Sequence, residues 1–104
     1  MYGLATHLVD GAPPVFHVAG DIDMANADEF SKDLKDALSA HPTLVLDMAK
    51  VTFLDAAGLR VILRIGEARN GQGPLPIVNA QRVRWLLDLV GHSETAAIVT
   101  CDGE

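Results

Sequence analysis

The sequence predicts an α/β fold in which helices pack on a mixed β-sheet, with the elements in the order β-β-α-β-α-β-α-β. Short apolar runs alternate along the chain with segments whose apolar residues recur every three or four positions. An Asp-Gly turn joins the first two runs, which is typical of a hairpin. In residues 44–65 an apolar run leads through a short connection into a helical pattern. Since 104 residues suffice for one core, we expect a single domain over residues 1–104.

The first two strands are expected at residues 4–9 and 15–19. Gly20 should end the second strand, so that Asp21 and Asp23 lie in the loop that follows.

A helix is predicted next, with Asn26 as its N-cap and Glu29 at the spacing of a capping box. Pro42 blocks its continuation. Its core-facing residues are Ala27, Phe30, Leu34, Ala37 and Leu38.

The central unit, residues 44–65, begins with a strand at residues 44–46. This strand is continuously apolar and should be buried on both faces. Asp47 is expected to end this strand. A second short apolar piece, residues 51–54, leads to Asp55 at the N-cap position of a second helix. The core face of that helix is Leu59, Ile62, Leu63 and Gly66.

The second helix should end by Asn70-Gly71, which is a typical stop. A short strand at residues 75–79, a helix at 80–90 closed by Gly91, and a last strand at 96–100 complete the fold. The third helix turns Val83, Leu86, Leu87 and Val90 toward the core.

The composition disfavours several classes of protein. The net charge is −6 and no Lys/Arg cluster is present, so we expect no direct binding of nucleic acid. No apolar run approaches the roughly 20 residues of a membrane span, and the N-terminus lacks a signal-peptide pattern. The single cysteine, Cys101, excludes an internal disulfide and is typical of the reducing cytoplasm.

Two pairs of aspartates have a chemical interpretation. Asp21 and Asp23 could form a carboxylate pair for acid–base chemistry or a hard metal ion, but a third ligand is missing at loop spacing and a solvated loop is favoured. Asp47 and Asp55, with Lys50 nearby, could form a phosphoryl-acceptor site. Capping of a helix explains the position of Asp55 better.

The other candidate residues form no catalytic pattern. The four histidines lack metal-ligand spacing, and neither a nucleophile elbow nor a phosphate-binding glycine loop occurs. Cys101 could be a redox contact or an inert thiol. Trp85 and Leu89 could anchor a partner or cover the edge of the core. We therefore expect no enzyme, no cofactor and no metal.

The central unit contains Leu46-Asp47-Met48 followed by Val51-Thr52-Phe53-Leu54-Asp55-Ala56-Ala57-Gly58-Leu59. These residues resemble the signature of the STAS domain, in particular of the bacterial anti-sigma factor antagonists, whose loop reads Asp-Ser-Ser-Gly-Leu or Asp-Ser-Thr-Gly-Leu. Gly20-Asp21-Ile22-Asp23 resembles the family's Gly-Glu-Leu-Asp, and residues 83–91 resemble its late leucine-leucine-x-x-x-glycine helix. The resemblance covers nearly the whole chain and implies a single STAS-like domain.

The resemblance also implies a cytoplasmic, protein-binding regulator. In the family, the antagonist docks on an anti-sigma factor, which is a serine kinase with a histidine-kinase-like ATPase fold, and so frees a sigma factor. The partner-binding surface implied here consists of Asp21, Asp23, Asp55, Ala57, Gly58 and Arg60. The kinase reverses docking by phosphorylating the hydroxyl just before the glycine. Both hydroxyl positions are alanine in this chain, Ala56 and Ala57, so we expect this switch to be missing.

This departure leaves two other functions open. The chain could be a STAS accessory subunit of a transporter or another multi-protein complex, or a STAS module that senses a small ligand. A weak homodimer is also possible, and membrane insertion is not expected.

Overall fold

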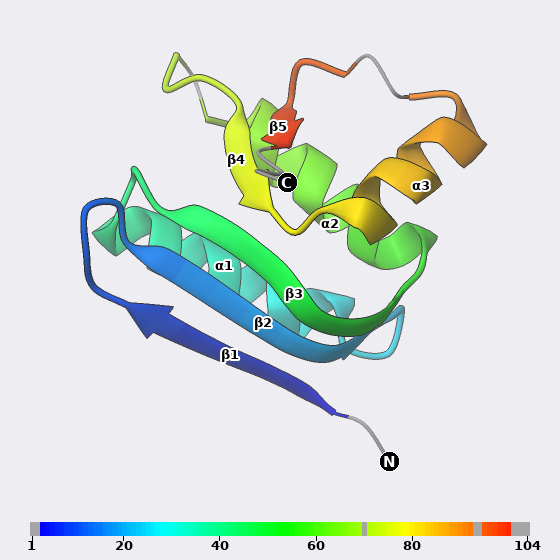
Figure 1. The fold of residues 1–104 in the computed structure, drawn as a ribbon, viewed down its shortest axis with the longest axis horizontal. Helices are drawn as coiled ribbons and strands as arrows, with labels where there is room; N and C mark the ends of the chain where they lie inside the picture. Colours follow the sequence, from blue (N-terminus) through cyan, green and yellow to red (C-terminus); the bar gives the residue numbers. More distant parts are fainter. Residues whose placement is uncertain (1–2, 70, 93–94, 101–104) are drawn as a thin grey trace.

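The computed structural model describes residues 3–69, 71–92 and 95–100, and these contain five strands and three helices in the predicted order. The elements are β1 (Leu4–Val9), β2 (Val15–Ile22), α1 (Ala27–Ala40), β3 (Val45–Leu54), α2 (Ala56–Glu67), β4 (Leu75–Val78), α3 (Gln81–Val90) and β5 (Ile98–Thr100). The strands form one mixed sheet in the order β1-β2-β3-β4-β5 (Figure 1). β1 is antiparallel to β2, and the other neighbours are parallel because a helix connects each pair.

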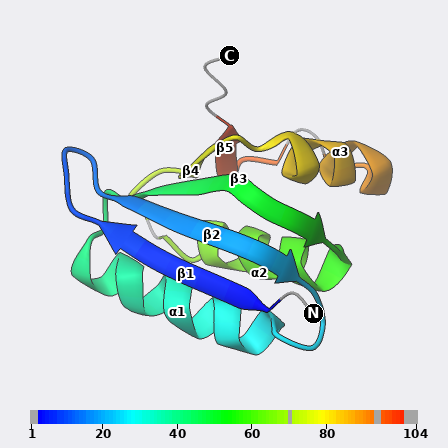
Figure 2. The ribbon, with the colours of Figure 1, turned by 60° about the horizontal axis from the view of Figure 1, so that its bottom comes forward.

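Two helices enclose the main core. α1 and α2 lie side by side on one face of the sheet (Figure 2). Phe30 and Leu34 of α1 and Ile62 of α2 are fully buried. Removing each such side chain from water stabilises the fold by roughly 1.5–3 kcal/mol. α3 lies apart from α1, at the end of the molecule that carries β4 and β5 (Figure 1).

The central strand β3 is longer than predicted, because Asp47 does not end it. The pairing of β3 with β2 slips by one residue at two places, after Asp47 and after Val51. Each slip is an extra residue in β3, and such a bulge changes which face the following side chains point to. Four unevenly spaced residues therefore all face the core: Leu46, Met48, Val51 and Leu54. Because of this uneven spacing, the sequence pattern predicted two short apolar segments where the structure has one bulged strand.

Gly20 does not end β2, which continues to Ile22. The φ angle of Gly20 is +94°, where other residues are strained, and an added Cβ would overlap the carbonyl oxygen of Gly3. The glycine thus lets the strand continue through a distortion instead of stopping it. The prediction that Asp21 lies in a loop is therefore wrong.

The remaining boundaries lie close to the predicted ones. α2 ends at Glu67, before the predicted stop at Asn70-Gly71, of which Asn70 lies outside the described residues. Gly91 closes α3 in the left-handed conformation, as predicted. β4 and β5 are each shorter than expected. Within the described ranges, no helix is long and apolar enough to cross a membrane.

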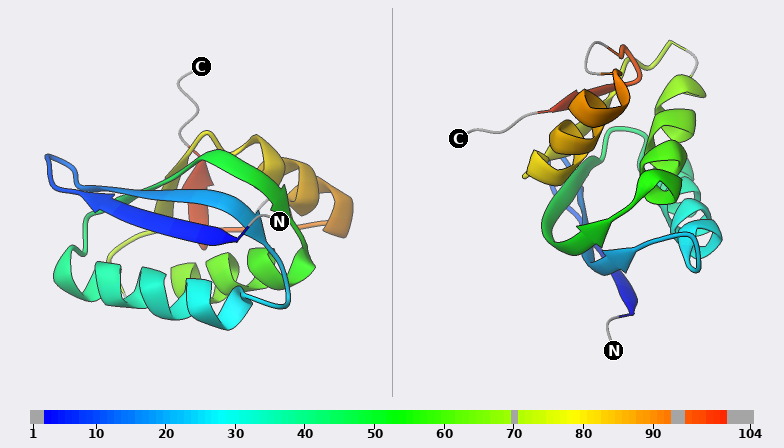
Figure 3. Two further views of the ribbon diagram at one scale, coloured as in Figure 1. Left: turned by 90° about the horizontal axis from the view of Figure 1, so that it is seen from below. Right: turned by 90° about the vertical axis from the view of Figure 1, so that its right-hand side faces the viewer.

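The face of β1 and β2 opposite α1 is open. Figure 3 shows no described helix over it. His7 and Val9 of β1 are exposed, as are Ala49 and Lys50 of β3. In the part of the chain that the structure describes, helices therefore cover only the other face of β1 and β2.

Candidate functional site

Asp55 connects the β2–α1 loop to the start of α2 at one end of the sheet. It is the N-cap of α2, and its Oδ1 accepts a hydrogen bond from the Gly58 N–H at 3.0 Å, which confirms the predicted cap. Its Oδ2 accepts a hydrogen bond from the N–H of Met24, in the β2–α1 loop, at 3.2 Å. The N–H of Asp55 donates to the carbonyl oxygen of Ile22 at 3.2 Å. One residue therefore ties the β2–α1 loop to the start of α2.

Asp23 and Asn26 close the β2–α1 loop on itself. Oδ1 of Asp23 accepts hydrogen bonds from the N–H groups of Ala25 and Asn26 at 2.9 and 3.3 Å. Asn26 Oδ1 accepts from the Asp23 N–H at 3.0 Å, and Asn26 Nδ2 donates to the Asp21 carbonyl at 2.8 Å. Because the Asn26 side chain turns back to the loop, it makes no capping hydrogen bond to α1. The predicted capping box with Glu29 is therefore wrong.

The Asp21 side chain bonds to the neighbouring strand. Its Oδ1 accepts a hydrogen bond from the Thr52 hydroxyl at 2.6 Å, near the carboxyl ends of β2 and β3. Asp21, Asp23 and Asp55 thus have separate donors, which order the loops. In the described part of the chain, no group of three or more His, Cys, Asp or Glu residues could hold a metal ion. The arrangement favours loop ordering over the carboxylate-pair interpretation.

The first turn of α2 presents small residues. Ala56 is exposed, Ala57 is half-buried and Gly58 is buried. A Cβ at Gly58 would come within 2.7 Å of side-chain atoms of both Ile22 and Leu54. The absence of a side chain at Gly58 therefore lets α2 begin directly against the core.

Two apolar side chains that sequence reasoning did not select flank this turn. Met24 is 77% exposed and Phe53 is 49% exposed. Met24 is an apolar residue in a polar loop, which is a signal that could have identified it. Phe53 stands in an apolar run, which gave no signal that its side chain is exposed. It is part of β3, where it follows the second bulge and is turned outward. Arg60 is exposed one turn into α2.

We call this combined region the cap surface. It consists of the predicted partner-binding residues and the flanking residues: Asp21, Asp23, Met24, Phe53, Asp55, Ala56, Ala57, Gly58 and Arg60. Acidic side chains and apolar side chains are mixed within it. Exposed methionine, aromatic and arginine side chains, here Met24, Phe53 and Arg60, belong to the residue types that are enriched at protein interfaces.

Asp47 lies elsewhere, within β3. Its Oδ2 is 3.0 Å from Nδ1 of His17, and its Oδ1 accepts a hydrogen bond from Asn79 Nδ2 at 2.9 Å. The His17 ring stacks on that of His7, with 6.4 Å between the ring centroids. At about 3.3 Å per residue of extended strand, Asp47 and Asp55 are roughly 20 Å or more apart. A phosphoryl-acceptor site that contains both aspartates is therefore wrong.

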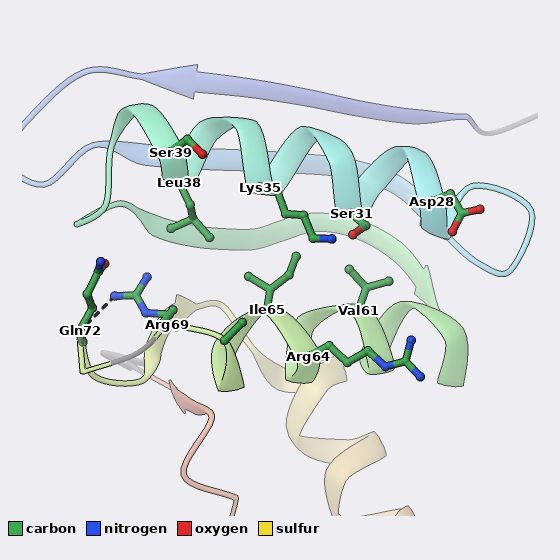
Figure 4. A pocket seen from close by; sticks show the side chains of 11 residues that line it. Asp28, Ser31, Lys35, Leu38, Ser39, Val61, Arg64, Ile65, Arg69 and Gln72 are labelled. Carbon is green, nitrogen blue, oxygen red and sulfur yellow. Dashed lines mark hydrogen bonds between the residues drawn. The ribbon is translucent and has the colours of Figure 1, made fainter.

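A groove of about 850 Å³ runs between α1 and α2 (Figure 4). Lys35 of α1 and Val61 and Ile65 of α2 point into it from opposite sides. At one end, Arg69 Nε donates a hydrogen bond to the Gly73 carbonyl at 2.9 Å. Sequence reasoning missed the groove because its residues are spread over two helices that are far apart in the chain.

The outer side of α3 is not part of the core. Trp85 is 65% exposed and Leu89 is 66% exposed, which favours the interpretation of these residues as a partner anchor over cover at the edge of the core. Arg82 links α3 to β3: its Nε donates a hydrogen bond to the carbonyl oxygen of Val51 at 2.9 Å. Cys101 lies outside the described residues.

Known proteins share this fold. The family model described as "Mlab, STAS domain" matches residues 8–100. An anti-sigma factor antagonist from Mycobacterium paratuberculosis is 23% identical, with a TM-score of 0.77 over 94% of this chain and 85% of that one. The unphosphorylated anti-sigma factor antagonist SpoIIAA is 16% identical, with a TM-score of 0.64 over 93% of this chain and 88% of that one.

A third similar structure is an uncharacterised protein from Shewanella loihica with a SpoIIAA-like fold. It is 12% identical, with a TM-score of 0.55 over 97% of this chain and 87% of that one. No curated protein gives a significant match. At these identities the structural likeness confirms the predicted fold.

Proposed function

This chain belongs to the STAS domain family, and from that we propose that it is a protein-binding regulator of the anti-sigma factor antagonist kind and not an enzyme. Its proposed partner is an anti-sigma factor with a histidine-kinase-like ATPase fold, in the cytoplasm of a bacterial cell. Docking would sequester the anti-sigma factor and free a sigma factor. The cap surface is the proposed docking surface.

The observation that carries this proposal is the double hydrogen bond of Asp55, to Gly58 and to Met24. It fixes the β2–α1 loop against the start of α2 before any partner is bound. Exposed Met24 and Phe53 then flank the small residues of the α2 turn. A surface that is ordered in advance loses little conformational entropy on binding, which favours affinity.

The proposed module lacks the phosphorylation switch of the family. Ala56 and Ala57 have no acceptor oxygen, and the nearest hydroxyl in sequence belongs to Thr52. That hydroxyl donates to Asp21, so a phosphate on it would set nearly two negative charges beside a carboxylate. We therefore propose that partner binding is constitutive and is controlled by the amount of the protein.

The substitution Ala57→Glu tests the cap surface. The fold should persist, because an acidic residue in the first turn interacts favourably with the helix dipole. Affinity for the ATPase-fold partner, measured by titration calorimetry, should fall about a hundredfold or more, since an unpaired carboxylate would be buried in the interface. The control is Ala5→Glu, which adds the same charge at an exposed position of β1.

The companion variant Ala57→Ser should bind normally. When its phosphorylation is mapped by mass spectrometry, the introduced hydroxyl should accept phosphate from the partner kinase. The unsubstituted chain should carry no phosphate on Thr52. A folded Ala57→Glu variant that binds the partner at full strength would show that the cap surface is not the interface.

The second candidate function is an accessory subunit of a transporter or another multi-protein complex. The alanines at positions 56 and 57 favour it, because a permanent subunit needs no phosphorylation switch. Purification of the chain with its native partner discriminates the two functions. A serine kinase of the ATPase fold supports the antagonist, and a transporter ATPase supports the accessory subunit.

A further inference from the structure

α3 carries an apolar stripe that the described part of the chain does not cover. Trp85 and Leu89, both about two-thirds exposed, stand four residues apart and are therefore neighbours on the helix surface. Val90 beside them is 47% exposed, so the prediction that it faces the core is wrong. Large exposed apolar patches mark interaction sites, and tryptophan is enriched among the residues that dominate binding energy. Figures 1 and 3 show α3 at the edge of the molecule, where another protein can reach it.

Charges of opposite sign flank the stripe. Arg84 and Asp88 are both exposed and are four residues apart. With about 3.6 residues per turn, they lie on the same flank of the Trp85–Leu89 stripe, Arg84 toward the start of α3 and Asp88 toward its end.

We propose that α3 is a self-association surface, which pairs with α3 of a second copy in antiparallel orientation about a two-fold axis. In this arrangement Trp85 of each copy packs against Leu89 of the other. Arg84 of each copy also lies level with Asp88 of the other, on the same flank of the interface. A surface that complements itself in this way is what a two-fold dimer requires.

The charges also select the orientation. In a parallel pair related by a two-fold axis, the Arg84–Asp88 flanks of the two copies would lie on opposite sides of the interface, so these charges would not meet. The antiparallel pair places the two flanks on the same side, where Arg84 of each copy faces Asp88 of the other. Because the charges of α3 complement those of a second α3 in this orientation, we name a second copy of this chain as the partner that binds the stripe.

The dimer should be weak. One short helix contributes the contact, so the buried area falls at the low end for specific interfaces. We expect a dissociation constant of about 10–100 µM. The cap surface is formed by other residues, so this inference does not depend on the proposed function.

The test uses the whole chain at concentrations from about 1 µM to 1 mM. Sedimentation equilibrium should show a monomer–dimer equilibrium. Trp85 is the only tryptophan, so the shift of its emission to shorter wavelength on dimerisation reports this surface specifically. Leu89→Lys should raise the dissociation constant at least about tenfold. The control Val9→Lys, at an exposed apolar residue of β1, should leave it unchanged.

Charge exchange then tests the orientation. Asp88→Arg should weaken self-association, because each pair becomes two arginines. The double variant Arg84→Asp/Asp88→Arg restores opposite charges in the antiparallel pair and should dimerise like the unsubstituted chain. Circular dichroism checks that the variants fold. A chain that stays monomeric at about 1 mM, or a dimer that Leu89→Lys does not weaken, would overturn the proposal; a dimer indifferent to the charge exchange would overturn its antiparallel geometry.

Discussion

At the scale of single residues, the two oxygens of Asp55 hold different parts of the chain. Oδ1 satisfies the Gly58 N–H at the start of α2, and Oδ2 satisfies the Met24 N–H in a loop 31 residues away. The first contact could be predicted, because a cap and the N–H that it receives are close in sequence. The second could not, because it depends on how β2 and β3 pair.

We predict that Asp55→Ala lowers the free energy of unfolding by about 1–2 kcal/mol, since it removes a helix cap and leaves a loop N–H without its acceptor. Urea denaturation followed by circular dichroism measures this change. Asp10→Ala, in the exposed β1–β2 turn, is the control and should have almost no effect. Equal stability of Asp55→Ala and the unsubstituted chain would contradict the capping role.

At the scale of elements, the sequence predicted the order of strands and helices but not the length of β3. Alternation of apolar and polar residues signals a strand, and two bulges break that alternation. Thr52 and Phe53 consequently both point outward, which a regular strand does not allow. The same bulge exposes Phe53 on the cap surface, so the missed site residue and the missed strand length have one cause.

The contact of α2 with the segment before β5 gives a second prediction. A Cβ at Gly66 would overlap the carbonyl oxygen of Ala97, which accepts a hydrogen bond from the Leu75 N–H at 3.0 Å. Gly66→Ala should therefore destabilise the fold by about 2 kcal/mol, even though alanine favours a helix by about 1 kcal/mol. Thermal unfolding measures this, with Gly3→Ala as the control because its Cβ would meet nothing within 4 Å. A higher melting temperature for Gly66→Ala would show that helix propensity prevails.

At the scale of the whole molecule, one core connects distant elements. Phe30 of α1 and Ile77 of β4 are both fully buried members of the same apolar cluster. Phe30→Ala and Ile77→Ala should each lower the stability of one shared unfolding transition by about 2–5 kcal/mol. Circular dichroism and amide exchange should report the same transition, and Val99→Ala, at an exposed position, should leave it in place. Two separate transitions would contradict a single domain over residues 1–104.

The strands stand in the sheet in the same order as in the chain, and this bears on how the protein folds. Among the five described strands, none has to be inserted between two others, so each pairing closes a loop that spans at most one helix. Short loops cost little entropy to close, and chains with such local contacts reach the native state quickly. During synthesis, the hairpin of β1 and β2 emerges first, and each later strand finds an edge already formed. The strands therefore leave the ribosome in the same order in which they join the sheet.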